Sequence, residues 1–239
     1  MEFLINNFYT LDSKNIFSSF PIYQQYSIHD KFQIARALDF AEKAHSKEKR
    51  ENGDDYITHP IAVAKIIMEL NVIPEIVISA LLHDVLEDTP VNFEEMHHEF
   101  GFHIAKIVNM LSKSYKIKIL DHNSDEERKL LHHYFLETIS DPKAAIIKIA
   151  DRLHNMRTLE YTKVEKQKRK SLETIKIYVP LALEMGLPEI SKELEEIAKK
   201  YLTKEEYVRA KEVSINYDKE IQEKGYHKNA IEKCVMEVF

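Results

Sequence analysis

Apolar residues recur three and four positions apart along most of the chain, which is the spacing of one face of an α-helix. The clearest segments cover residues 30–45, 60–70, 74–88, 142–159 and 188–202. Proline stands at the start of several of them, where its missing N–H costs nothing and its fixed φ suits a helix. With only four glycines and no tryptophan among 239 residues, this pattern predicts an all-α protein.

Capping residues predict where several helices begin and end. Asn92 can cap a helix that stops at Gly101, a second short helix follows over 103–112, and Asp141 precedes Pro142 at the start of another. Two capping boxes predict helices over 124–139 and from Thr203 toward 225. Pro180 should interrupt the helix that ends near Gly186.

The same pattern suggests three parts. Residues 1–27 show no clear period and are expected to form an N-terminal extension, residues 28–202 to form the main helical domain, and residues 203–239 to form a helical appendage. Residues 112–123 are polar and irregular and are interpreted as a mobile loop, and the lysine-rich stretch 163–170 as a solvated face.

Composition narrows the class of protein. The formal net charge is −6, from 34 basic and 40 acidic residues, so no overall field attracts a nucleic acid polymer or a membrane surface. No glycine-rich phosphate loop occurs, which excludes Walker and Rossmann nucleotide sites. The single Cys234 excludes a disulfide framework, and without a signal peptide or a membrane-length apolar run we expect a soluble cytoplasmic protein.

The stretch HDVLEDT, residues 83–89, places one imidazole and three carboxylates at the end of an apolar helix. On a continuous helix His83 would stack on Glu87, and Asp84 on Asp88, each four residues apart. Such charges are costly to desolvate unless a metal or a partner compensates them. A solvated helix end explains any one of them alone, but the cluster favours a site.

Two further residues extend the cluster, because His59 stands at the mouth of one apolar helix and Asp151 lies inside another. Together with His83 and Asp84 they give the order H…HD…D. Two imidazoles and two carboxylates suit Mn²⁺, Fe²⁺, Co²⁺ or Mg²⁺ and disfavour sulfur-loving metals. Histidine and aspartate are common, so the pattern alone is only moderately specific.

The segments RENGDDYITHP, ALLHDVLEDT and IKIADRLHNMRTL resemble the signatures of the HD-domain hydrolase half of the RelA/SpoT alarmone enzymes, and ETIKIYVPLALEMGL and KELEEIAKKYL extend the similarity over roughly residues 30–207. The resemblance implies an all-helical HD-domain bundle that binds one Mn²⁺, another divalent ion being an alternative. It also implies removal of the 3′-pyrophosphate from the guanosine alarmones ppGpp and pppGpp, giving GDP or GTP and pyrophosphate.

Carried over by motif position, the resemblance assigns roles to individual residues. The implied metal ligands are His59, His83, Asp84 and Asp151, and the implied acid/base pair is Glu87 and Asp88. The implied substrate contacts are Arg50, Asn52, Asn155 and Thr158, with Lys148, Arg152 and Arg157 as weaker candidates that could instead hold a carboxylate or face solvent. We interpret His154 as structural and His97, His98, His103, His132, His133 and His227 as surface residues.

Two departures from the family pattern qualify these expectations. Glu51 stands where the family usually has a basic residue, and Asp55 where it has proline, so the nucleotide-side loop is more acidic. The chain also ends about 35 residues after the resemblance fades, so we expect the hydrolase-only type without alarmone synthesis. The tail from Thr203 is expected to cover the bundle or to mediate self-association into a homo-oligomer.

Two other functions compete with alarmone hydrolysis. One is an HD phosphohydrolase acting on another nucleotide such as NADPH. The other is a catalytically inactive HD module that senses a nucleotide, although such a module has no need for both Glu87 and Asp88.

Overall fold

The computed structural model describes residues 16–112, 141–213 and 234. These residues form helices and turns, and the described ranges contain no strand, only one isolated bridge between Lys49 and Asp55. The predicted all-α class is therefore confirmed. The chain divides into two compact units, residues 1–114 with 234–239 and residues 115–233. Among the described residues, no helix is long and apolar enough to cross a membrane.

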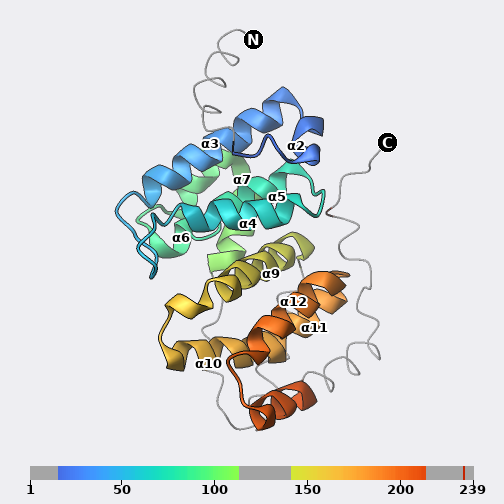
Figure 1. Cartoon of the computed structure of the whole chain (residues 1–239). Coiled ribbons are helices and arrows are strands. Elements are labelled where there is room, and N and C mark those ends of the chain that lie inside the picture. Colours follow the sequence, from blue (N-terminus) through green and yellow to red (C-terminus); the bar gives the residue numbers. More distant parts are fainter. Residues whose placement is uncertain (1–15, 113–140, 214–233, 235–239) are drawn as a thin grey trace. The chain divides into compact units, whose positions relative to one another are not determined.

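The first unit contains six of the described helices (Figure 1). They are α2 (Pro21–Gln25), α3 (Ile28–Ala44), α4 (Thr58–Met68), α5 (Pro74–Leu81), α6 (Val85–Asp88) and α7 (Phe93–Ser112).

Helix α3 begins two residues earlier than its apolar pattern predicts. The Ser27 hydroxyl accepts from the Asp30 backbone N–H at 3.1 Å, and the Asp30 carboxylate accepts from the Ser27 N–H at 3.2 Å. This reciprocal capping box satisfies two N–H groups that would otherwise lack partners at a helix start. Just before it, the Tyr26 hydroxyl donates to the Val72 carbonyl at 2.6 Å.

Helix α5 is the centre of the first unit. Every residue from Ile76 to Leu81 is at most 4% exposed, and the helix packs against α3, α4 and α7. A helix that is apolar on all sides must be buried on all sides. The buried helix expected after Pro74 is therefore confirmed.

The continuous helix predicted over residues 74–88 is wrong at its end. Helix α5 stops at Leu81, and residues 82–84 form a turn before the single turn of α6. His83 and Asp84 thus stand in a turn rather than on a helix. The continuous helix on which His83 was predicted to stack on Glu87 is therefore interrupted between the two residues.

Helix α7 bends at Gly101, whose backbone has φ 81° and ψ 166°. That conformation is essentially restricted to glycine. The Asn92 side chain accepts from the Glu95 N–H at 3.0 Å and caps the first half of the helix. The two short helices predicted on either side of Gly101 are confirmed as the two halves of α7.

The second unit contains α9 (Pro142–Arg157), the 3₁₀ turn η2 (Leu159–Tyr161), α10 (Val164–Glu173), the π-helical turn η3 (Thr174–Tyr178), α11 (Val179–Glu184) and α12 (Pro188–Lys199). Residues 204–213 are also helical. Figure 1 shows α9, α10, α11 and α12 in yellow to orange. Helix α12 packs against α9, α10 and α11.

Local sequence explains the ends of these elements. The Asp141 carboxylate accepts from the Lys143 and Ala144 N–H groups, as predicted for the start of α9. Pro180 interrupts the regular α-helix, as predicted. The chain forms the π turn η3, and α11 begins at Val179, one residue before the proline. Gly186, with φ 79°, ends α11.

The capping box predicted at Thr203 and Glu206 is formed. Lys168 of the lysine-rich stretch 163–170, interpreted as a solvated face, pairs with Glu206 at 2.6 Å, and the stretch is a mixture of exposed and half-buried residues. The predicted loop 113–123, the helix predicted over 124–139, the surface histidines His132, His133 and His227, and the chain from 214 to 225 lie outside the described residues.

Candidate active site

Two imidazoles of the first unit are buried close to each other. His59 lies in the first turn of α4 and is 2% exposed, and His83 follows α5 and is 5% exposed. Their ring centroids are 5.1 Å apart. The Thr58 hydroxyl donates to the Asp55 carbonyl at 2.8 Å, which fixes the loop that delivers His59 to the start of α4.

The environment of His83 determines which ring nitrogen carries the proton. Nδ1 lies 2.8 Å from the Ala80 carbonyl oxygen, and a carbonyl can only accept a hydrogen bond, so Nδ1–H is the donor. In the neutral ring, Nε2 then has its lone pair directed away from α5. This pattern, in which Nδ1 donates to a backbone carbonyl and so leaves Nε2 as the unprotonated nitrogen, is typical of metal-binding histidines.

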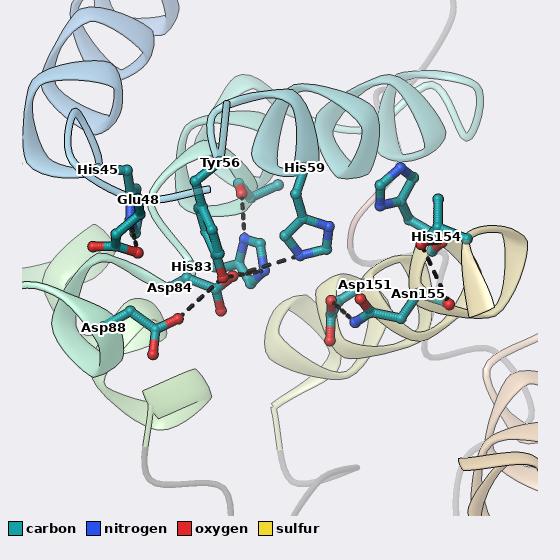
Figure 2. Close-up of polar contacts among 12 residues, drawn as sticks. His45, Glu48, Tyr56, His59, His83, Asp84, Asp88, Asp151, His154 and Asn155 are labelled. Atoms are coloured by element: carbon teal, nitrogen blue, oxygen red, sulfur yellow. Dashed lines mark hydrogen bonds and ion pairs between the residues drawn. The ribbon is translucent and has the colours of Figure 1, made fainter. Parts of the chain in front are cut away.

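The Asp84 carboxylate is where the polar groups of this unit converge. Its Oδ2 lies 3.0 Å from His83 Nε2 and 3.5 Å from His59 Nε2, and it accepts a hydrogen bond from the Tyr56 hydroxyl at 2.7 Å (Figure 2). Two imidazole nitrogens and one carboxylate oxygen, buried or half-buried, form a mixed donor set that fits a divalent cation. The donor chemistry and the orientation of His83 both suit a metal ion.

The proposed acid/base residues lie on α6, directly after Asp84. The Glu87 and Asp88 N–H groups both donate to the Asp84 carbonyl, at 3.1 and 2.9 Å, so α6 is anchored on Asp84. Both side chains are exposed. Partial desolvation and the negative charge of Asp84 raise the pKa of Asp88, and the hydrogen bond from Tyr56 opposes this effect.

Three residues of this site were not predicted from the sequence. The Tyr56 hydroxyl also lies 3.0 Å from Asp88 Oδ2, and its ring stacks on His45 with centroids 4.5 Å apart. His45 is buried and its Nδ1 lies 3.1 Å from Glu48 Oε2. The position of Tyr56 three residues before His59 was the only signal in the sequence that could have pointed to it.

The loop before α4 holds the two predicted substrate contacts of this unit. The Arg50 guanidinium lies 6.0 Å from the centre of the Tyr56 ring. Asn52 uses its side chain inside the loop, where Nδ2 donates to Asp54 Oδ2 at 2.7 Å and Oδ1 accepts from the Asp54 N–H at 3.1 Å. The loop closes through an ion pair between Lys49 and Asp55 at 2.5 Å.

In the second unit, α9 carries the predicted ligand Asp151 in a half-buried position. Asn155 Nδ2 donates to Asp151 Oδ1 at 2.5 Å, so the two residues share a face as predicted (Figure 2). Thr158 caps the helix, and its hydroxyl donates to the His154 carbonyl at 3.1 Å. Lys148, one turn before Asp151, is half-buried.

Two weaker candidates of α9 have protein partners. Arg152 is 6% exposed, pairs with Glu173 at 3.0 Å, and lies 4.1 Å from the centre of the Tyr178 ring. Arg157 donates two hydrogen bonds to Glu193, at 2.7 and 2.9 Å. Both arginines therefore hold carboxylates, which is one of the roles that the sequence left open.

Three of the remaining described histidines agree with their interpretation. His97, His98 and His103 are exposed, as expected for surface residues. His154 is half-buried.

A family model described as HD domain matches residues 37–187. A guanosine-3′,5′-bis(diphosphate) 3′-pyrophosphohydrolase of Aquifex aeolicus (strain VF5) is 43% identical over 175 residues, which are 73% of this chain and 25% of the relative. A GTP pyrophosphokinase of Streptomyces coelicolor is 42% identical over 166 residues, covering 70% of this chain and 19% of the relative.

The bifunctional (p)ppGpp synthase/hydrolase SpoT of Escherichia coli (strain K12) is 36% identical over 206 residues, covering 86% of this chain and 28% of the relative. The chain thus spans about a quarter of the length of the curated relatives it matches. A solved structure described as "A metazoan ortholog of SpoT hydrolyzes ppGpp and plays a role in starvation responses" matches with a TM-score of 0.49 and 20% identity, over 81% of this chain and 96% of that one.

Proposed function

The chain belongs to the HD domain family, and from this membership we propose that it is a metal-dependent hydrolase that removes the 3′-pyrophosphate from guanosine alarmones. The observation that carries the proposal is the convergence of two buried imidazoles on the Asp84 carboxylate, within the segment that the family model matches. The substrate class is supported by the names of the relatives, among them the Aquifex aeolicus 3′-pyrophosphohydrolase. We further propose that residues 28–202 act as the catalytic domain.

We propose that His59, His83 and Asp84 of the first unit bind the metal together with Asp151 of the second unit. His59, His83 and Asp151 are side chains of the kind that hold a metal ion. The family match spans residues 37–187 and thus includes all four. Because the donors are two nitrogens and two carboxylates, we propose Mn²⁺ as the ion, with another divalent cation as an alternative.

A divalent ion held by these residues would supply Lewis-acid chemistry, namely polarisation of a phosphoryl oxygen and compensation of the charge that develops during hydrolysis. The chain's own residues orient this chemistry. The Ala80 carbonyl fixes the His83 tautomer, and the Tyr56 hydroxyl fixes one oxygen of Asp84. On α9, the Asn155 amide holds the Asp151 carboxylate in one orientation.

Glu87 and Asp88 are proposed as the acid/base pair. One carboxylate takes a proton from the attacking water as the water oxygen bonds to phosphorus. The bond from phosphorus to the ribose 3′-oxygen breaks. The other carboxyl group returns a proton to that oxygen, so the products are GDP or GTP and pyrophosphate. The raised pKa of Asp88 makes it a better proton acceptor than an ordinary aspartate, which suits a member of an acid/base pair.

The proposed substrate contacts divide between the two units. Arg50 can hold a phosphate or stack on the base, and Asn52 acts by shaping the loop through Asp54. On α9, Asn155 and Thr158 remain proposed contacts, together with Lys148.

A substrate panel tests the proposal. Purified protein is incubated with Mn²⁺ and with ppGpp, pppGpp, NADPH or GTP at equal concentration. The initial rate at which pyrophosphate or inorganic phosphate is released is measured for each. We expect the two alarmones to be hydrolysed and the other nucleotides to react much more slowly. Preferential attack on NADPH would replace the substrate assignment, and metal-dependent nucleotide binding without turnover would indicate a sensor module.

A further inference from the structure

One tyrosine hydroxyl connects two residues to which different tasks are assigned. The Tyr56 hydroxyl oxygen lies 2.7 Å from Asp84 Oδ2 and 3.0 Å from Asp88 Oδ2 (Figure 2). Asp84 is the carboxylate on which the imidazoles converge, and Asp88 belongs to the proposed acid/base pair. Tyr56 comes from the loop before α4, whereas both carboxylates belong to the turn and helix that follow α5.

A phenol has one proton to donate, and both carboxylates compete for it. Asp84 Oδ2 is the closer acceptor, and Asp88 Oδ2 accepts from the same hydroxyl as the longer branch of a bifurcated hydrogen bond. The phenol of a tyrosine is an O–H donor at neutral pH, so it can donate to these carboxylates. The hydroxyl therefore fixes the spacing between two carboxylates that would otherwise repel each other.

The ring of Tyr56 is itself supported from behind. It stacks on the buried His45 ring with an interplanar angle of 25° and centroids 4.5 Å apart. Glu48 Oε2 lies 3.1 Å from His45 Nδ1, and the Glu48 carbonyl accepts from the Tyr56 N–H at 3.2 Å. The three residues thus form a row from the end of α3 to the carboxylates, and each fixes the next.

Resting on the function proposed above, we propose that Tyr56 is a positioning residue that holds Asp88 in register with Asp84, and that the His45–Glu48 pair fixes the plane of its ring. Tyr56 transfers no proton in the reaction. It acts through the two carboxylates, in the way that partners behind the ligands orient a metal site.

Removing only the hydroxyl tests the main contact. In Tyr56→Phe the ring remains on His45, so we expect kcat at saturating Mn²⁺ to fall by about 10- to 100-fold while KM stays within about threefold. Tyr26→Phe is the matched control, because it also removes a buried tyrosine hydroxyl bond, 2.6 Å long to the Val72 carbonyl, away from the site. Equal kcat values for the two variants would overturn the proposal.

A double-mutant cycle identifies the path of the effect. If Tyr56 acts through Asp88, then Tyr56→Phe causes little further loss of kcat in an Asp88→Asn background. Fully multiplicative losses would contradict the proposed register between the two residues.

Mn²⁺ binding provides a readout that needs no turnover. Measured by electron paramagnetic resonance, the affinity of Tyr56→Phe for Mn²⁺ should be about 10-fold weaker than that of Tyr26→Phe, because Asp84 loses its orienting donor. Unchanged affinity would overturn the role at Asp84, even for a protein that hydrolyses no alarmone. A wild-type protein that binds Mn²⁺ without turnover would instead contradict the proposed function alone.

The supporting ring is tested at His45. His45→Ala removes the stacked ring and should lower kcat as Tyr56→Phe does, whereas His45→Phe keeps a stacking ring and should restore most of the rate. Thermal unfolding identifies any variant that fails to fold. Equal kcat values for the alanine and phenylalanine variants would show that stacking does not matter.

Discussion

At the scale of single residues, Asp84 has the largest number of tasks. Its Oδ2 lies near both imidazoles and accepts from Tyr56, while its backbone carbonyl accepts the N–H groups of Glu87 and Asp88. The side chain therefore serves the metal, and the backbone fixes where the acid/base pair begins.

Asp84→Ala should abolish Mn²⁺ binding and hydrolysis together. The variant removes one of the two proposed carboxylate ligands and leaves His59, His83 and Asp151, which are too few donors to hold the ion firmly. Isothermal titration with Mn²⁺ and the rate of ppGpp hydrolysis are the measurements. Asp39→Ala, which removes an exposed aspartate paired with Lys43, is the control and should change neither quantity. Retained Mn²⁺ binding in Asp84→Ala would contradict the ligand assignment.

Glu87→Gln should separate chemistry from metal binding. The amide keeps the shape of the side chain and cannot take a proton from water, so we expect kcat to fall by about 10²- to 10⁴-fold. Mn²⁺ affinity should stay within about threefold of wild type, because Glu87 is not among the proposed ligands. Glu69→Gln, at an exposed position of the same unit, is the control. A fully active Glu87→Gln would show that the base is assigned wrongly.

At the scale of elements, the apolar pattern predicts most of the described helices, because burial and capping are local properties. The starts of α9 at Asp141 and of α7 at Asn92 follow from side chains that cap the backbone within three residues. The break between α5 and α6 is not marked by glycine or proline. The helical spacing of residues 83–88 therefore does not predict that α5 ends before His83.

The same distinction applies to the site. His59, His83 and Asp84 are recognisable because a polar residue beside an apolar run is unusual. Tyr56 and His45 are ordinary residues whose role depends on contacts with other segments, such as the contact between Tyr56 and Asp84, which are 28 positions apart in the sequence. No local pattern contains that information.

The arginines of α9 allow a direct comparison of a buried and an exposed ion pair. The side chains of Arg152 and Glu173 are 8% and 12% exposed, and the side chains of Arg157 and Glu193 are 41% and 39% exposed. Arg152→Met should lower the free energy of unfolding by about 3 kcal/mol, because Glu173 loses its most buried ion-pair partner and keeps only the more exposed Lys170 and Arg169. Arg157→Met should lower it by less than about 1 kcal/mol.

Urea denaturation followed by circular dichroism measures both changes. In the double variant Arg152→Met/Glu173→Gln, part of the stability should return, because no buried charge is left without its partner. Equal losses for the two single arginine variants would show that Arg152 is not an internal structural residue.

At the scale of the whole molecule, the proposed ligands come from both compact units. His59, His83 and Asp84 belong to the first unit and Asp151 to the second. A metal that binds the folded chain and not the unfolded chain stabilises it in proportion to the logarithm of the metal concentration. Binding of the ion should therefore stabilise the folded chain.

Differential scanning calorimetry tests this linkage. Mn²⁺ should raise the Tm of the wild type, and chelation should remove the increase. At 100 times Kd the expected stabilisation is about 2.7 kcal/mol. Asp151→Ala should lose most of the increase, whereas Glu160→Ala, at an exposed position of the second unit, should retain it. An undiminished increase in Asp151→Ala would remove Asp151 from the ligand set.

The reaction proposed for this chain is cleavage of the bond between the ribose 3′-oxygen and phosphorus in an alarmone, which releases both phosphates together as pyrophosphate. The most direct test is phosphorus NMR of ppGpp incubated with the purified protein and Mn²⁺. We predict that the alarmone signals are replaced by those of GDP and pyrophosphate in equal amounts, and that Asp84→Ala produces neither. An unchanged spectrum with Mn²⁺, Co²⁺, Fe²⁺ and Mg²⁺ in turn would contradict the claim.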